Sequence, residues 1–348
     1  MKKFTSKVVV GLGFGDCGKG LTTSYLCSKV ENPIVVRFNG GHQAGHTVHY
    51  KGKRHVFSNF GSGTLQDVPT FWSKNCTFSP IGFVSERALL DNPLFFIDPL
   101  CPVTTPLDKL INQQRDSKLK HGTIGVGFGT TVERHENNCK FYVQDLFYGS
   151  VLDEKIKMVE NYYKLKFGDD LKPFISAIKE ARKHINLCYD KILLERHTPI
   201  FEGAQGIMLD KDFGFFPHVT RSNTTTKLAH ELWSIDEVYY ITRSYQTRHG
   251  NGPMAKPGTL KLKNTQDETN KPNKFQGEFR TAPLDVDMLN HALLCDDNYS
   301  SECSKNLVVT CMDQHEIDVD MLLKQLDTEF DHVYVSDGPS LSHIKLYK

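Results

Sequence analysis

Short apolar runs alternate with longer amphipathic stretches along most of this chain. Runs rich in β-branched and aromatic residues are typical of buried strands, and apolar residues at three- and four-residue spacing are typical of helices. Their alternation predicts an α/β fold: a single large doubly wound, mostly parallel sheet with flanking helices and with ligand loops at the carboxyl ends of its strands. The predicted strands are 8–10, 33–38, 94–97, 199–202, 237–242, 307–310 and 333–336, and the predicted helices are 21–30, 85–90, 286–294 and 320–327.

Three segments depart from this alternation. Residues 48–57 predict a hairpin that turns at Lys51-Gly52. Residues 151–195 carry helical periodicity with many Lys and Glu side chains, and they predict a helical elaboration packed on the sheet. Residues 256–272 form a polar excursion that we expect to face solvent. The chain contains no internal repeat, and we expect residues 1–348 to form one domain.

The overall composition is close to electrically neutral. Lys and Arg number 42 and Asp and Glu number 41, which gives no electrostatic reason to expect a nucleic acid or an anionic membrane as partner and favours a small-molecule ligand. The nine cysteines include no CxxC pair, which favours reduced thiols over a disulfide scaffold or a zinc site. No apolar run approaches the roughly 20 residues of a membrane span, and no leader precedes the first strand pattern, so we expect a cytoplasmic protein.

The first candidate site is the glycine loop after the strand at 8–10. Alternating glycines let its backbone N–H groups turn toward an anion, and Lys19 adds a mobile positive charge. The GxxxxGK spacing fits a phosphate-binding loop, but Gly20 stands where Ser or Thr would hold Mg²⁺. Asp16 would repel phosphate oxygens unless a metal or an acid–base role required it. The loop therefore predicts phosphate binding combined with chemistry, and the alternative is a purely structural turn.

Further polar loops follow other predicted strands. Residues 39–47 (NGGHQAGHT) come directly after the second strand, where they could face the same ligand. Residues 121–131 (HGTIGVGFGTT) are expected to be mobile until a ligand binds, with a disordered linker as the alternative. Gln205 offers a neutral donor and acceptor suited to a base or amide edge, and residues 215–226 add Thr220 and other hydroxyls that could take phosphate.

Six motifs occur in order along the chain: GDCGKG (15–20), GGHQAGHT (40–47), FEGAQGIMLD (201–210), FPHVTRSNTT (216–225), TRHGNGP (247–253) and SDGP (336–339). Together they resemble the adenylosuccinate synthetases, and the resemblance covers nearly the whole chain. The resemblance implies a carbon–nitrogen ligase that phosphorylates the 6-oxo group of a purine monophosphate with a nucleoside triphosphate and then lets L-aspartate displace the phosphate. It also implies Mg²⁺ as cofactor and a homodimer.

In the family, a basic residue of one subunit reaches the monophosphate of the other. The aligned position here is Asn138, so Arg134 or Lys140 would have to take its place.

The resemblance assigns the catalytic roles to Asp16, His46 and Lys19. Asp16 would take the N1 proton and hold Mg²⁺ together with the Gly45 carbonyl, and His46 would donate to the charge that develops between O6 and the γ-phosphate. The nucleoside triphosphate would contact Gly15, Gly18, Lys19, Gly20, Gly45, His46, Thr47, Asp313, Ser336, Gly338 and Pro339; the monophosphate nucleotide Asp16, Asn39, Gln43, Thr123, Gln205 and Thr220; and L-aspartate Arg248, Arg280 and Thr281.

Departures from the family pattern indicate a particular branch. The arginine-rich loop that holds aspartate and reaches the ribose 2′-hydroxyl is QGEFRTAPLD here, with Arg280 as its one cation and with Gly277 or Glu278 nearest the ribose contact. The base-reading TKxD is TCMD (310–313), which lacks the lysine that lies on guanine. Cys17 and Gln43 replace a glutamate and an asparagine. These changes resemble the phage branch that makes N6-succino-2-amino-2′-deoxyadenylate from dGMP, L-aspartate and ATP, which would act in the host cytoplasm.

Three alternatives stay open at this level. The first is an ordinary adenylosuccinate synthetase that uses IMP, GTP and L-aspartate. The second is an inactive nucleotide-binding protein that senses purines, against which Asp16, Lys19 and His46 together argue. The third is a small-molecule kinase, which leaves the histidine of the second loop unexplained.

Overall fold

The computed structural model describes residues 4–119, 122–255, 260–263 and 277–348. Within them, ten strands form one sheet, and its neighbouring strands are parallel except for the pair β13–β14 at one edge. The predicted α/β fold with a mostly parallel sheet is confirmed. In spatial order the strands are β14 (Ile344–Leu346), β13 (His332–Ser336), β12 (Ser304–Thr310), β9 (Glu237–Arg243), β1 (Lys7–Gly11), β8 (Thr198–Glu202), β2 (Pro33–Arg37), β5 (Thr70–Trp72), β6 (Phe95–Ile97) and β7 (Asn186–Leu187).

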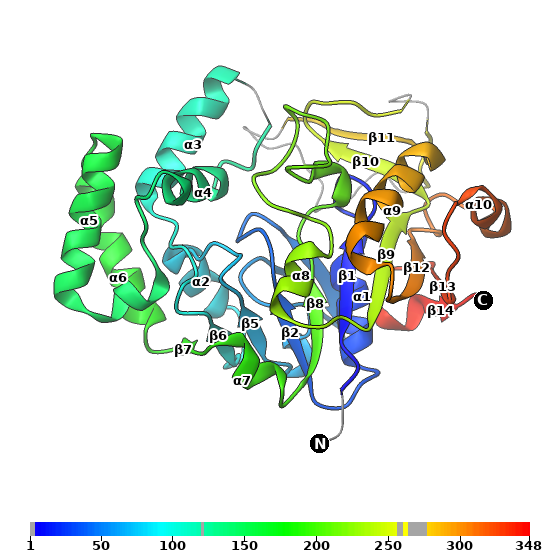
Figure 1. Ribbon diagram of the computed structural model, residues 1–348, viewed down its shortest axis with the longest axis horizontal. Coiled ribbons are helices and arrows are strands. Elements are labelled where there is room, and N and C mark those ends of the chain that lie inside the picture. Colours follow the sequence, from blue (N-terminus) through cyan, green and yellow to red (C-terminus); the bar gives the residue numbers. More distant parts are fainter. Residues whose placement is uncertain (1–3, 120–121, 256–259, 264–276) are drawn as a thin grey trace.

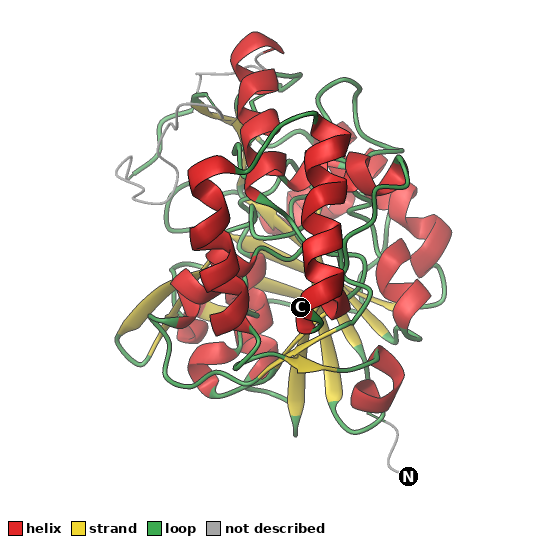
Figure 2. Cartoon of the chain, turned by 90° about the vertical axis from the view of Figure 1, so that its left-hand side faces the viewer, coloured by secondary structure: helices red, strands yellow, loops and turns green. Residues whose placement is uncertain are grey.

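Helices surround this sheet (Figure 1 and Figure 2). One group packs on one face, a second on the other face, and a third gathers at the β6–β7 end. The first is α1 (Lys19–Cys27); the second is α7 (Asp190–Leu194), α8 (Lys227–Leu232), α9 (Val286–Ser300) and α10 (Val319–Gln325); the third is α2 (Pro80–Arg87), α3 (Pro106–Leu119), α4 (Phe128–Glu136), α5 (Gly149–Tyr163) and α6 (Leu171–Ala181).

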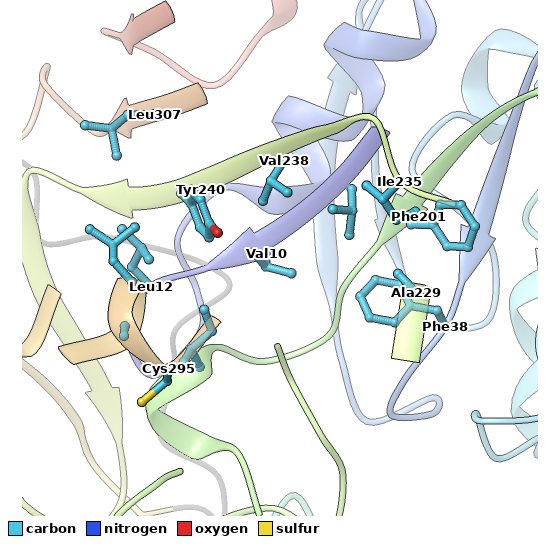
Figure 3. Close-up of a cluster of buried hydrophobic side chains, with 14 of the residues drawn as sticks. Val10, Leu12, Phe38, Phe201, Ala229, Ile235, Val238, Tyr240, Cys295 and Leu307 are labelled. Carbon is cyan, nitrogen blue, oxygen red and sulfur yellow. The ribbon is translucent and has the colours of Figure 1, made fainter. Parts of the chain in front are cut away.

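The central strand β1 is buried from both faces. Val8 and Val10 lie in a core with Ala229 of α8, and Figure 3 shows Val10 and Ala229 on this side of the sheet. Val9 points the opposite way, into a core with Leu26 of α1. Covering by helices on both sides explains why the sequence of this strand is a continuous apolar run rather than an alternating one.

Two antiparallel ribbons complete the fold. The first, β3 (His46–Tyr50) with β4 (Lys53–Phe57), confirms the predicted hairpin. The second pairs β10 (Tyr245–His249) with β11 (Phe279–Pro283), and Figure 1 shows it above the carboxyl end of β1. It was not predicted, because its two strands are separated by the long polar excursion.

Several element boundaries differ from the predictions. Helix α2 begins at Pro80 instead of residue 85, because Ser79 caps it by accepting a hydrogen bond from the Gly82 N–H (3.2 Å). Helix α3 was missed, α9 extends six residues further than predicted, to Ser300, and the last residues of the glycine-rich segment 121–131 already belong to α4.

The helical elaboration at 151–195 forms as α5, α6 and α7. However, α6 packs against α2, and α5 and α6 share their core with β5 and β6 at one end of the sheet. Residue 121 and most of the excursion 256–272 lie outside the described residues. Among the described residues, no helix combines the length and apolarity needed to cross a membrane.

Candidate functional site

The loops after β1, β2 and β8 lie side by side, and the sequence predicted such an arrangement for the first two. The Met208 N–H donates to the Gly13 carbonyl (3.2 Å), and the Ala204 N–H donates to Asn39 Oδ1 (2.7 Å). A Cβ atom on Gly206 would stand 2.2 Å from the Gly13 carbonyl oxygen, so a side chain there would push two loops apart. Glycines therefore allow three strand ends to meet at one place.

Lys19, the first residue of α1, is buried between two of these loops. Its ammonium group donates to the Gln205 carbonyl and lies 3.7 Å from Cys17 Sγ. Gly18, the residue before it, has a left-handed backbone (φ 93°) and provides no side-chain cap, which leaves the first N–H groups of α1 for an anion. A Cβ atom on Gly18 would stand 2.9 Å from Thr310 Cγ2. This helix start suits a phosphate group.

His46 and Glu202 form a buried pair with 2.6 Å between Nδ1 and Oε1. Glu202 also accepts hydrogen bonds from the N–H (3.1 Å) and the hydroxyl of Ser62. Burial raises the pKa of Glu202, but His46, Arg37 and Ser62 outweigh burial and bring this pKa to about 2. An ionised carboxylate only accepts hydrogen bonds, so Nδ1 of His46 carries the hydrogen and Nε2 is left for chemistry. Burial lowers the pKa of His46 itself, despite Glu202.

Glu202 was missed as a site residue, although it belongs to the FEGAQG motif. It ends the fully buried strand β8, where an ionised carboxylate is costly unless it is paired. A lone glutamate at the end of an apolar strand could have been recognised from the sequence by this argument. His46 itself comes close to α1 because Gly20 is bare, since a Cβ atom on Gly20 would stand 2.8 Å from His46 Cβ.

Asp16 has a left-handed backbone (φ 51°) within the glycine loop. Arg243 Nε donates to its carbonyl, and His249 Nε2 lies 3.2 Å from its Oδ2. Burial raises the pKa of Asp16, but the hydrogen bond and charge of His249 and the charges of Arg243 and Lys19 outweigh burial, so this pKa lies below its ordinary value. Asp16 is therefore ionised at neutral pH. Neither Arg243 nor His249 was predicted as a site residue.

Arg248 and Arg280 stand directly opposite each other on the β10–β11 ribbon, and Thr281 follows Arg280. Each guanidinium donates to a backbone carbonyl of residues 252–253, and neither Nε has a hydrogen-bond partner within the described residues. Burial and the charge of Arg280 lower the pKa of Arg248 to about 10, and burial lowers the pKa of Arg280 despite Glu278. An anion bound beside both groups would relieve this repulsion.

The predicted base-binding residues lie at the ends of the neighbouring strands β12 and β13. The Met312 N–H donates to the Ser336 carbonyl (3.0 Å), which joins the two strand ends. Asp313 Oδ2 accepts a hydrogen bond from Gln314 Nε2 (2.6 Å), and Ser336 Oγ donates to the Gly338 carbonyl (2.9 Å). Together with Pro339, these residues form one corner of the carboxyl edge of the sheet.

Several of the predicted contact residues are available to a ligand. Both amide atoms of Gln43, and Oε1 of Gln205, are buried without a hydrogen-bond partner in the described part of the chain. Gly45 is exposed immediately before β3, and Thr47 and Thr220 are half-buried. Buried polar atoms without partners are costly, so the two glutamines are the best candidates for ligand contacts.

Two predicted contacts are occupied by the protein itself. Asn39 Nδ2 donates to the backbone carbonyls of Ala204 (3.3 Å) and Asn223 (3.0 Å), which holds the loops after β2 and β8 together. The Thr123 hydroxyl donates to Asp116 and accepts from Asn112 Nδ2 (3.0 Å). Both side chains therefore have structural roles within the protein.

Arg134 is wrong as a candidate to reach a partner subunit. Its guanidinium is fully buried within the protein, with Nε 2.9 Å from Asp108 Oδ1 and further bonds to the Cys139 and Val103 carbonyls. Lys140 is exposed and keeps that candidacy.

The chain is similar in sequence to the adenylosuccinate synthetases, whose family model matches residues 8–293. The adenylosuccinate synthetase of Thermoplasma volcanium is 29% identical over 324 residues, which cover 83% of this chain and 72% of the relative. That of Hahella chejuensis is 32% identical over 276 residues, which cover 71% of this chain and 63% of the relative. The chain thus spans less than two thirds of the length of the second relative.

Two solved structures share the fold. The fully ligated adenylosuccinate synthetase of Plasmodium falciparum superimposes with a TM-score of 0.80 at 18% identity, covering 99% of this chain and 100% of that chain. The succinoaminodeoxyadenylate synthetase of cyanophage S-2L, bound to dGMP and to dATP as energy donor, superimposes with a TM-score of 0.69 at 16% identity, covering 99% of this chain and 96% of that chain.

Proposed function

We propose that this chain, which belongs to the adenylosuccinate synthetase family, joins L-aspartate to C6 of dGMP at the expense of ATP. The products are N6-succino-2-amino-2′-deoxyadenylate, ADP and phosphate. The observation that carries the reaction class is that an ionised carboxylate, Asp16, and the buried His46–Glu202 pair both lie beside the uncapped start of α1, which suits a phosphate group.

In the first step, Asp16 accepts the N1 proton of the purine, and the electron pair released makes O6 a nucleophile. O6 attacks the γ-phosphorus of ATP, the bond from that phosphorus to the ADP oxygen breaks, and a 6-phosphoryl nucleotide forms. The amine of L-aspartate then attacks C6, the C6–O bond breaks, and phosphate leaves with that electron pair while the amine loses a proton. Lys19 and the N–H groups at the start of α1 hold the phosphates in place.

His46 stabilises the charge that develops between O6 and the γ-phosphate. Because Nδ1–H points at Glu202, Nε2 can donate to an oxyanion only when the imidazole is protonated. Glu202, with its pKa of about 2, stays ionised and stabilises this imidazolium, and the bound phosphates add further negative charge. Burial alone would keep His46 neutral, so substrate binding completes the catalytic state of the pair.

The residues present fit a magnesium ion that is shared with the phosphates. Mg²⁺ prefers oxygen ligands and is commonly held by one or two protein groups together with phosphates and water. Asp16 keeps about a third of its side chain exposed (36%), and the Gly45 carbonyl lies on an exposed turn. The described residues contain no group of three or more His, Cys, Asp or Glu side chains that could hold a metal alone. Bound there, Mg²⁺ would neutralise phosphate charge.

The arginine pair of the ribbon is the best site for the carboxylates of L-aspartate. Arg248 and Arg280 carry two positive charges side by side, and both guanidinium groups retain an unused Nε–H among the described residues. Thr281 adds a hydroxyl beside them. The two carboxylates of L-aspartate would neutralise the positive charges of this pair.

Two departures support dGMP and ATP over IMP and GTP. Gly277 and Glu278 are both exposed, and neither offers a cation to a ribose 2′-hydroxyl. Without such a contact, the site has no reason to prefer a ribonucleotide over a deoxyribonucleotide. The corner at β12 and β13 offers Cys311 and Met312 where a lysine would lie on guanine. The cyanophage protein with the same fold binds dGMP.

The relatives in sequence are named adenylosuccinate synthetase, which favours the alternative of IMP and GTP as substrates. Purified protein incubated with Mg²⁺, L-aspartate and each of the four pairs of dGMP or IMP with ATP or GTP separates the two. We expect the succinylated product and phosphate with dGMP and ATP. Turnover with IMP and GTP alone would establish the alternative, and formation of ADP without aspartate consumption would indicate a kinase.

A further inference from the structure

His249 is a second histidine at the reacting carboxylate. It ends β10, directly after Arg248, and its Nε2 lies 3.2 Å from Asp16 Oδ2. Its side chain is 11% exposed, and the ring of Phe279, its cross-strand neighbour, packs against it with centroids 4.9 Å apart. The imidazole is therefore fixed by the ribbon on one side and by a charged partner on the other.

Asp16 is held at two of its three oxygens. Arg243 fixes the backbone carbonyl, and His249 fixes Oδ2. The third oxygen, Oδ1, accepts no hydrogen bond from any described residue. Because an Asp side chain rotates about two bonds, fixing the backbone and one carboxylate oxygen also fixes the direction of the other.

We propose that His249 is a positioning residue for phosphoryl transfer: by donating Nε2–H to one lone pair of Oδ2, it directs Oδ1 of Asp16 at the N1 proton of the acceptor purine and leaves the second lone pair of Oδ2 for Mg²⁺. This inference rests on the proposed function, in which Asp16 is the base. We expect this positioning by His249 to matter most for a guanine. The 2-amino group donates electron density to the ring and makes N1–H a weaker acid than in hypoxanthine. A less acidic proton needs a well-aligned base.

The test replaces His249 in two ways. His249→Phe keeps a flat ring beside Phe279 but removes the donor, whereas His249→Gln keeps an N–H donor on a shorter side chain. The matched control is His184→Phe, which removes a histidine–carboxylate pair of similar geometry (2.9 Å to Glu180) at the end of α6. Each variant is purified as the full chain, and its melting temperature is measured first.

The readout is positional isotope exchange in β,γ-bridge ¹⁸O-labelled ATP and in GTP labelled in the same way, with the acceptor nucleotide present and L-aspartate absent. This exchange reports formation of the 6-phosphoryl intermediate alone. We expect His249→Phe to slow exchange by about 10- to 100-fold, the loss usual for a hydrogen-bond partner that orients a reacting group, with the KM for L-aspartate in the full reaction unchanged within about twofold. His249→Gln should recover most of the rate, and His184→Phe should match the wild type.

Exchange by His249→Phe within about twofold of the wild type would overturn the proposal. The proposal would also be overturned if His249→Gln lost as much of the exchange rate as His249→Phe and if both losses paralleled a lower melting temperature. The wild type is assayed first with both acceptors, and the variants are then compared with the acceptor that supports exchange. Exchange with IMP alone would refute dGMP as substrate, but the comparison of variants would still test the role of His249. A wild type that exchanges with neither acceptor would refute both.

Discussion

Glu202 and Asp16 are two carboxylates that lie near the start of α1, and each is ionised for a different reason. Glu202 is completely buried and depends on His46, Arg37 and Ser62 to offset the cost of burial. Asp16 keeps part of its side chain exposed and depends mainly on His249. In the proposed reaction, Glu202 supports a charge on a neighbouring side chain, and Asp16 reacts.

Replacement of Glu202 by Gln should therefore impair turnover more than binding. The amide has nearly the shape of the carboxylate but no charge, so it cannot stabilise the imidazolium of His46. We expect kcat to fall by roughly 100-fold or more while the KM values change little, as when the carboxylate partner of a catalytic histidine is made neutral. Steady-state kinetics with saturating substrates measures both quantities.

Glu86→Gln is the matched control for this prediction. Glu86 is another buried glutamate, but its carboxylate accepts mainly from the backbone N–H groups of Ser58 and Asn59. Its replacement should lower stability and leave kcat within about threefold. Equal losses of kcat in the two variants would mean that Glu202 has only a structural role.

At the scale of elements, the site depends on glycine loops that touch without side chains between them. The closest approach joins the loops after β1 and β8, where Gly206 lies over the Gly13 carbonyl. The same two loops are tied by Lys19, whose ammonium bonds to Gln205 across 186 residues of sequence. Any added atom in this contact must move one of the two loops.

Gly206→Ala should accordingly destabilise the protein by about 1–3 kcal/mol, the usual cost of overpacking a rigid contact. Gly13→Ala is the comparison, because a Cβ atom on Gly13 would meet nothing within 4 Å. Denaturant unfolding of both variants measures the free energy. A Gly206→Ala protein as stable as the Gly13→Ala protein would contradict the close packing of the two loops.

The sequence predicted the elements far better than their contacts. The strands β1, β2 and β8 are short apolar runs followed by glycine or asparagine loops, and these signals are local. The pairing of His46 with Glu202 spans 156 residues and depends on the order of strands in the sheet, which periodicity does not contain. Arg134 was misjudged for the same reason, since its partner Asp108 lies in the unpredicted helix α3.

At the scale of the whole molecule, the sheet joins two differently built parts. Around β1 and β9, helices on both faces leave the carboxyl edge free for the glycine loops and the β10–β11 ribbon. Beyond β5, helices α2, α5 and α6 enclose a second core with many aromatic side chains. Two partly buried histidines lie at the border of this second part, His42 beside Gly82 of α2 and His135 in α4. Both are neutral, and they affect how the molecule responds to acid.

His42 and His135 have pKa values of about 4 and about 3, lowered by burial and then by the charges of Lys109 and Arg134 respectively. An unfolded chain binds these protons near pH 6.5, so the stability contribution of each neutral histidine is complete above pH 6.5 and is lost as the pH falls toward its folded pKa. We therefore expect the free energy of unfolding to decrease from pH 6.5 to pH 5, where most carboxylates are still ionised.

His135→Gln isolates one of these groups, because Gln can accept the hydrogen bond that His135 Nε2 receives from the Phe141 N–H (3.1 Å) but takes up no proton. Denaturant unfolding at pH 5 and at pH 6.5 should show a smaller loss of stability in this variant than in the wild type. If His135→Gln and the wild type lose the same free energy, protons are taken up elsewhere in the molecule, and the neutral state of His135 does not control its acid sensitivity.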